Sequence, residues 1–364
     1  MVVDRADRIA GAIYGMALGD SWGYPTEFMG HGEILRRKPA PPIPLRVTDD
    51  TQMSLYNVEA LRRIYSSQLD LSALGTDTGL QNLVRRIFAD QHLNFEIDRD
   101  NNRAPGNTVM GALSRYRRSS QLTGLEGSSQ NNSKGCGTVM RAPWLGMLPV
   151  DRQAVINLAI LQSETTHGHP VAALASATVA ILLKEIFEGT YRPIEADARN
   201  RVVAALYRSL EAVTEIQASS SSLVESARFK EGVREFREMI YEVLQGLEET
   251  EHDELENPEA NICYWFGEGW IGDEALLCAI GALAIYGERS FQGIERLVFS
   301  SGDSDSIAAV GGSLLGALNG YSSLASQADS SGHRIIGAFE PRYEHELSEA
   351  VRFFSDLQAT RSQQ

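Results

Sequence analysis

Apolar side chains recur along most of this chain at the three- and four-residue spacing of an α-helix. After Thr51, for example, they occupy Met53, Tyr56, Ala60 and Ile64, positions that share one face of a helix. Alternation of the kind found in strands is scarce, and no repeat of fixed length occurs. The pattern therefore predicts an all-α fold.

The same periodicity separates helices from polar loops. The predicted helices are Asp7–Leu18, Gln52–Tyr65, Gln81–Phe88, Arg152–Ser163, Pro170–Phe187, Ala196–Ala212, Ala227–Leu247, Asp273–Tyr286, Gly293–Ser300, Ser306–Gly320 and Glu344–Leu357. The predicted loops are the Pro-rich, basic segment His31–Arg46, the Ser/Asn/Gly segment Arg117–Gly135, the polar segment Gln217–Ser222 and the acidic run Glu248–Pro258. None of these loops separates two self-sufficient cores. We therefore expect residues 1–364 to form a single compact multi-helix domain with loop insertions near 31–46, 117–135 and 248–258.

Two short aspartate clusters stand where helices begin, near opposite ends of the chain. Thr48–Thr51 opens the amphipathic segment described above, and Asp303–Ser306 opens a segment that is small and apolar at nearly every position. Such a composition is typical of a fully buried helix. Aspartate, serine and threonine are also the usual N-caps, so either cluster alone would indicate only a cap. Two doubled clusters, each opening an apolar helix, favour a shared site.

If the fold joins these helix starts, four carboxylates and several hydroxyl groups converge. Unpaired charge that is removed from water is very costly, so such a cluster requires bound cations. Ligands that are all oxygen atoms suit Mg²⁺ or Mn²⁺ better than Zn²⁺. The sequence thus predicts a divalent-cation site.

Charge and cysteine content restrict the classes of partner and compartment. The chain has 48 acidic and 33 basic residues, a formal net charge of −15, which argues against general binding to nucleic acid or to an anionic membrane. An anionic ligand then needs local help from cations, helix N-termini or backbone N–H groups. Cys136, Cys263 and Cys278 show neither metal-type spacing nor an even count. We therefore expect a reduced, cytoplasmic protein.

Other motifs add chemistry to this picture. Glu27 follows the first Gly-rich helix and is flanked by aromatic residues, where its pKa can be tuned for proton transfer. The turns Ala104–Thr108 and Gly135–Arg141 offer backbone N–H groups that can hold a diphosphate. His167 opens a long helix as a cap or as a ligand contact, and the loop Gly267–Glu274 carries Trp270 toward a rim.

Together these motifs resemble those of the ADP-ribosylglycohydrolase family, which includes dinitrogenase-reductase-activating glycohydrolases and ADP-ribosyl-acceptor hydrolases. The matching segments follow the family order: GAIYGMALGDSWGYPTEF, TDDT, PGNT, GCGTVMRAP, THGHP and SGDSDSIAAVGGSLLGAL. The resemblance implies a compact all-α fold with a binuclear Mg²⁺ or Mn²⁺ site at the base of a cleft. It also implies hydrolysis of the glycosidic bond between ADP-ribose and a modified protein side chain or a small acceptor, with arginine on a protein as the expected acceptor.

The resemblance also implies roles for individual residues. The two cations are expected at Thr48, Asp49, Asp50, Asp303, Asp305 and Ser306, with Glu27 as the catalytic residue near the scissile bond. The ADP-ribose-binding residues are expected to be Gly106, Asn107, Ser133, Gly135, Gly137, Thr138, Val139, Met140, Arg141 and His167. One departure concerns an aspartate that some members carry before Gly106. This chain has Ala104 and Pro105 there, and Asp98 and Asp100 do not obviously replace it.

Two other functions remain open. An immunity or antitoxin protein that binds and blocks an ADP-ribosylating toxin, with or without hydrolysis, would insert the basic residues Arg36, Arg37, Lys38 and Arg46 into an acidic site. A pure binder, however, does not need six oxygen ligands. A metal-dependent phosphohydrolase also uses paired aspartates, but such sites normally include histidine, and neither cluster contains one.

Overall fold

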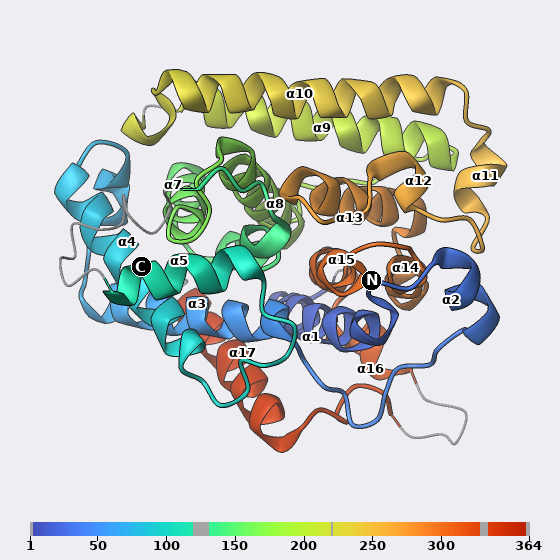
Figure 1. The fold of residues 1–364 in the computed structure, drawn as a ribbon, viewed down its shortest axis with the longest axis horizontal. Helices are drawn as coiled ribbons and strands as arrows, with labels where there is room; N and C mark the ends of the chain where they lie inside the picture. Colours follow the sequence, from blue (N-terminus) through green and yellow to red (C-terminus); the bar gives the residue numbers. More distant parts are fainter. Residues whose placement is uncertain (1–2, 119–130, 220, 328–333, 362–364) are drawn as a thin grey trace.

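Segments with helical periodicity form helices here because their apolar faces are buried against one another. The computed structural model describes residues 3–118, 131–219, 221–327 and 334–361 (Figure 1). Within these ranges, extended pairing is limited to two single bridges, Leu45 with Phe339 and Gly135 with Ile271. The predicted all-α fold is confirmed.

The described residues form helices of very different length. The longer ones are α1 (Arg5–Gly23), α3 (Asp49–Ser66), α4 (Thr78–Glu96), α5 (Asn107–Arg118), α7 (Arg152–Ser163), α8 (Pro170–Glu188), α9 (Ala198–Ala218), α10 (Ala227–Glu248), α13 (Gly272–Tyr286), α14 (Ser290–Val298), α15 (Ser304–Asn319) and α17 (Pro341–Arg361). The shorter ones are α2 (His31–Arg37), α11 (His252–Glu256), α12 (Cys263–Phe266) and α16 (Tyr321–Ala325). Single 3₁₀ turns are η1 (Tyr24–Thr26), η2 (Leu71–Gly75), η3 (Cys136–Thr138), η4 (Pro143–Met147) and η5 (Ser222–Val224).

Three of the predicted loops need correction. The segment 31–46 begins with helix α2, and the acidic run 248–258 contains helix α11. Residues 119–130, the middle of the predicted loop 117–135, lie outside the described residues. Helix α9 extends to Ala218, into the segment predicted as the polar loop 217–222. The acidic starts of α3 and α15 belong to the helices themselves, which therefore begin earlier than predicted.

The core lies where α8, α13 and α15 pack together. Helices α9 and α10 cover this core on one side, and α3 and α17 lie on the other (Figure 1). By length and composition α8 could cross a membrane, but 94% of that stretch is buried inside the protein. Its apolar character is therefore explained by its central position in the fold.

Helices α1 and α15 are in backbone contact along their length, through the small residues that the sequence spaces every fourth position. A Cβ added to Gly15 would lie 2.2 Å from the carbonyl oxygen of Gly312, and one added to Gly23 would lie 2.5 Å from Asp305 Cα. The two helices run antiparallel, since the later residue of α1 meets the earlier residue of α15. This close packing places the end of α1 against the start of α15.

Candidate active site

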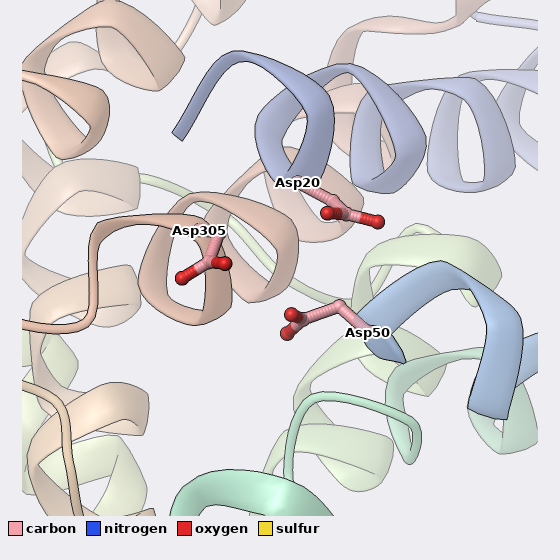
Figure 2. A group of neighbouring side chains, drawn as sticks. All are labelled: Asp20, Asp50 and Asp305. Carbon is pink, nitrogen blue, oxygen red and sulfur yellow. The ribbon is translucent and has the colours of Figure 1, made fainter. Parts of the chain in front are cut away.

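The packing of α1 on α15 brings the two aspartate clusters together. Asp50, in the first turn of α3, and Asp305, in the first turn of α15, point toward one another and toward Asp20 of α1 (Figure 2). One carboxylate oxygen from each lies within 4.8 Å of the other two. A second group, Glu27, Asp303 and Asp305, meets the same distance limit. Two sets of three carboxylates, with Asp305 in common, thus converge.

Asp20 is a residue of this site that the sequence prediction missed. It is fully buried, and its oxygens accept the backbone N–H and the hydroxyl of both Thr48 and Thr51 at 2.5 to 3.1 Å. A carboxylate has about four lone-pair positions, so these four donors occupy all of them. Asp20 therefore caps the start of α3 from another helix and fixes where Asp49 and Asp50 lie.

Asp50 differs from Asp20 because one of its oxygens lacks a partner. Asp50 Oδ1 is buried and has no hydrogen-bond partner among the described residues. Burial, and then the charges of Asp20 and Asp49, raise the pKa of Asp50 well above its usual value. Burial and the charge of Asp303 act in the same way on the pKa of Asp305. The cluster therefore holds more negative charge than the protein around it compensates.

These observations fit a divalent cation. A buried carboxylate oxygen without a donor, beside two further carboxylates, requires positive charge to offset its desolvation. The nearby hydroxyl groups of Thr48 and Ser306 are also buried and supply further oxygen donors. Such an oxygen-only set suits Mg²⁺ or Mn²⁺. The acidic cluster therefore has the chemistry of a metal site.

Glu27 reaches the cluster from the turn after α1. The hydroxyl oxygen of Thr26 lies 2.7 Å from the carbonyl of Gly23 and 3.0 Å from the hydroxyl of Ser304, which ties this turn to the start of α15. Burial, followed by the charge of Asp303, raises the pKa of Glu27 to about 7. Near neutral pH this side chain can therefore hold or release a proton, as a general acid or base requires.

Several of the predicted ADP-ribose-binding residues form a continuous chain beside the carboxylates. The N–H of Gly106 donates to Asp49 Oδ2 at 3.3 Å. Two residues later, the Thr108 hydroxyl lies 3.0 Å from the Ser133 hydroxyl. Ser133 Oγ accepts in turn from the N–H of Gly135 at 3.2 Å. The structure thus brings together turns that lie far apart in the sequence.

Cys136 and His167 extend this chain. The Cys136 thiol donates to Asp303 Oδ2 at 2.8 Å. A Cβ added to Gly135 would lie 3.0 Å from His167 Nε2, and one added to Gly137 would lie 3.2 Å from its Cε1. The imidazole therefore occupies the space that these two glycines leave. Asn107, the first residue of α5, is exposed beside Gly106.

Thr138, Val139, Met140 and Arg141 do not match the expected binding surface, because their side chains are buried and at most 2% exposed. The 3₁₀ turn η3 lies within the segment Gly135–Arg141, and the 3₁₀ turn η4 follows it. The N–H groups of Val139 and Met140 both donate to the carbonyl of Cys136. These two N–H groups are therefore used within the turn and are not free to hold a diphosphate.

Arg141 acts on the site through Thr166. Its guanidinium donates to Gln162 Oε1 at 2.6 Å and to Thr166 Oγ1 at 2.8 Å. Thr166 Oγ1 lies 2.9 Å from His167 Nδ1, so Arg141, Thr166 and His167 form one hydrogen-bonded row. Burial, then the charge of Arg141, lowers the pKa of His167 to about 3, so the ring is neutral at pH 7. Its other nitrogen, Nε2, faces Gly135.

Asp98 and Asp100 do not supply the aspartate that is missing before Gly106. Arg342 Nη1 donates to Asp98 at 2.8 Å and to Asp100 at 2.9 Å, and Asp98 also accepts from the Tyr56 hydroxyl. The hydrogen bond from Arg342 holds the pKa of Asp98 well below its usual range. Both carboxylates therefore serve to hold the connection between α4 and α5 against α17.

Comparison with known proteins shows which family has this sequence. A sequence model of the family described as ADP-ribosylglycohydrolase matches residues 1–330. The uncharacterized protein YegU of Escherichia coli (strain K12) is 25% identical over 341 residues, which cover 88% of this chain and 90% of YegU. The ADP-ribosyl-[dinitrogen reductase] glycohydrolase of Rhodospirillum rubrum is 27% identical over 217 residues, which cover 54% of this chain and 64% of that protein.

A solved structure, an ADP-ribosylglycohydrolase-related protein complex, has the same fold. Its TM-score is 0.59 at 22% identity, and the alignment covers 96% of this chain and 98% of that one. Members of the matched family hydrolyse ADP-ribosyl glycosidic bonds, which suits a site of clustered carboxylates bordered by glycine turns. This chain belongs to the ADP-ribosylglycohydrolase family.

Proposed function

We propose that this protein hydrolyses the glycosidic bond between ADP-ribose and arginine on a modified protein, in a reaction that depends on Mg²⁺ or Mn²⁺. The observation that carries the proposal is the convergence of two carboxylate sets that share Asp305. They come from α1, the turn after it, α3 and α15, and the glycine contacts hold α1 and α15 together. A protein with only a binding role has no need for this buried charge.

We propose two cations in this cluster, held by Thr48, Asp49, Asp50, Asp303, Asp305 and Ser306. The two carboxylate sets that share Asp305 support the number of cations. The unpartnered Oδ1 of Asp50 supports their place. Bound divalent cations supply Lewis acidity toward ribose and water oxygens. Asp20 is not among the proposed ligands, because its lone pairs are used by Thr48 and Thr51.

The chain's own residues then bind the substrate and move the proton. Glu27, whose carboxylate lies within 4.8 Å of those of Asp303 and Asp305, donates a proton to the departing acceptor or accepts one from the attacking water, while charge develops on the ribose ring. His167 Nε2 donates a hydrogen bond to an oxygen of ADP-ribose beside Gly135. Because Glu27 and His167 are in place before the substrate binds, they act on the developing charge without reorganisation of the site.

The test is release of ADP-ribose from an arginine-modified protein in Mg²⁺. We expect Asp303→Ala to lower turnover by roughly 10²- to 10³-fold, the effect of removing one strong electrostatic stabiliser, and EDTA to abolish it in the wild type. Asp253→Asn removes a carboxylate whose side chain is 85% exposed and serves as the control. Undiminished turnover in Asp303→Ala would remove the proposed site, and release of phosphate instead of ADP-ribose would indicate a phosphohydrolase.

No observation favours the immunity function over hydrolysis. Within the basic segment, Arg37 pairs with Glu33 and Lys38 pairs with Glu259 at 2.9 Å, so part of its charge is already used within the chain. A toxin partner remains a prediction. We also propose a reducing, cytoplasmic location, which the three free cysteines support.

A further inference from the structure

Two aromatic side chains stack beside the acidic cluster and remain open to solvent. The rings of Phe28, in the turn after α1, and Trp270, in the connection between α12 and α13, have centroids 5.1 Å apart and an interplanar angle of 20°. Phe28 is 75% exposed and Trp270 is 36% exposed. Large apolar rings usually gain their stabilisation from burial, which Phe28 largely lacks.

Phe28 is held in a backbone conformation that favours glycine. The N–H of Met29 donates to the carbonyl of Thr26 at 2.9 Å, which closes a turn with Glu27 at φ −50° and ψ 136° and Phe28 at φ 63°. These angles fit a type II turn, whose third residue is normally glycine. An exposed phenylalanine at this position costs free energy that burial does not offset. Strain of this kind is typical of residues kept for function.

Trp270 is fixed by a segment that also borders the acidic cluster. Its carbonyl accepts the N–H of Cys136 at 3.1 Å, and its indole Nε1 donates to Glu268 at 3.3 Å. The carbonyl of Glu268 accepts the N–H of Asp303 at 2.8 Å. Between them, a Cβ added to Gly269 would lie 3.5 Å from Asp303 Cβ. These contacts therefore fix the position of the Trp270 indole relative to the carboxylates at the start of α15.

The charge beside the aromatic pair selects its ligand. Glu27 directly precedes Phe28, and Glu268 hydrogen-bonds to Trp270, so carboxylates border both rings. A phosphate is disfavoured at such a place. A planar cation gains from both features, since it stacks on an aromatic face and donates charge-assisted hydrogen bonds to carboxylates. Among protein side chains, the guanidinium of arginine has this combination.

We propose that Phe28 and Trp270 form the binding site for the guanidinium group of ADP-ribosylated arginine and set the preference for arginine over neutral acceptors. This inference rests on the proposed function and adds the residues that select the acceptor. In that reaction the acceptor is the leaving group and lies within reach of Glu27 when the bond breaks. Phe28 follows Glu27 in the same turn, so its ring is held next to the residue that we propose to exchange a proton with the acceptor or the water.

The test compares variants on two peptides of the same sequence that carry ADP-ribose on arginine or on serine. In Phe28→Gly the new residue suits the turn, so the melting temperature should stay constant or rise. Loss of the cation–π contact in Phe28→Gly or Trp270→Leu should lower kcat/KM for the arginine peptide roughly 3- to 30-fold, with little change for the serine peptide. Phe28→Tyr keeps a ring and should retain activity. Tyr241→Leu removes a half-exposed ring from α10 and is the matched control.

A second measurement does not need turnover. The wild type should bind N-acetylarginine amide in calorimetry, and Phe28→Gly should bind it more weakly by a similar factor. Equal affinities, or an equal loss of kcat/KM on both peptides, would overturn the guanidinium site. Weaker inhibition of the variants by free ADP-ribose would show that the rings bind the nucleotide and would also overturn it. A wild type that binds the amide through these rings but releases no ADP-ribose would remove only the proposed hydrolysis.

Discussion

Replacing Asp50 by asparagine should stabilise the cation-free protein and remove most of its stabilisation by Mg²⁺. Asparagine keeps the shape and an acceptor oxygen, so the change is confined to one charge. The carboxylates of Asp20, Asp50 and Asp305 lie within 4.8 Å of one another. At this distance each pair of full charges repels by about 3.5 kcal/mol with an effective dielectric constant of ~20.

Protonation limits this repulsion but has its own cost. Keeping one carboxyl neutral costs about 1.4 kcal/mol for each pH unit above its ordinary pKa, or about 6 kcal/mol at pH 8. Whichever route the wild type takes, its ion-free cluster is destabilising by several kcal/mol. We therefore expect Asp50→Asn to raise the free energy of unfolding in EDTA at pH 8 by about 2–4 kcal/mol.

Urea denaturation followed by circular dichroism measures both effects. A cation at 100 times its dissociation constant should add about 2.7 kcal/mol to the wild type and clearly less to Asp50→Asn. Asp253→Asn makes the same charge change at an exposed position and should alter neither value. A variant that is less stable than the wild type in EDTA, or that gains as much from Mg²⁺, would refute this reasoning.

Three further changes test other parts of the structure. Because burial and Asp303 raise the pKa of Glu27 from 4.5 to about 7, the folded protein binds more protons than the unfolded chain across this window. Its stability in EDTA should therefore fall as pH rises from 4.5 to 7, and Glu27→Gln should flatten that fall in urea titrations. If the Thr166 hydroxyl keeps the hydrogen of His167 on Nε2, Thr166→Val should lower kcat/KM and let the hydrogen move to Nδ1, which imidazole ¹⁵N shifts detect. Thr166→Ser keeps the hydroxyl and should retain both the wild-type kcat/KM and the wild-type shifts. Gly15→Ala forces a Cβ to 2.2 Å from a backbone oxygen and should lower the free energy of unfolding in urea by about 1–3 kcal/mol. Gly246→Ala is the control, because its added Cβ meets no atom within 4 Å, and it should not lower that free energy.

Two missed helices show what periodicity can and cannot predict. Helix α5 buries Val109, Ala112, Leu113 and Tyr116, which have the i, i+3, i+4, i+7 spacing of a helical face. Its signal was present in the sequence, but the prediction assigned neither a helix nor a loop to these residues. Helix α2 buries only Ile34, and one apolar contact leaves no periodicity to detect. The local sequence pattern thus predicts helices that bury several side chains along one face, and it fails for helices that bury a single side chain.

The residues of the acidic cluster also differ in how far the sequence alone reveals their roles. Its two aspartate pairs are visible in the sequence because each opens an apolar helix. Asp20 also leaves a signal, since it is the only charged residue between Arg8 and Glu27. Its partners Thr48 and Thr51, however, lie 28 and 31 residues further along the chain. Tertiary structure is therefore needed to show that it caps α3.

The helix ends around the acidic cluster offset only part of its negative charge. Helices α3 and α15 both direct their N-termini at the carboxylates, and each N-terminus stabilises a nearby negative charge by about 0.3–1 kcal/mol. Repulsion within the cluster is about 3.5 kcal/mol for each charged pair, so two helix ends offset only part of it. The four donors to Asp20 are spent on positioning α3. The remaining deficit lies at Asp50 and Asp305, where a divalent cation would lower the charge and stabilise the fold at the same time.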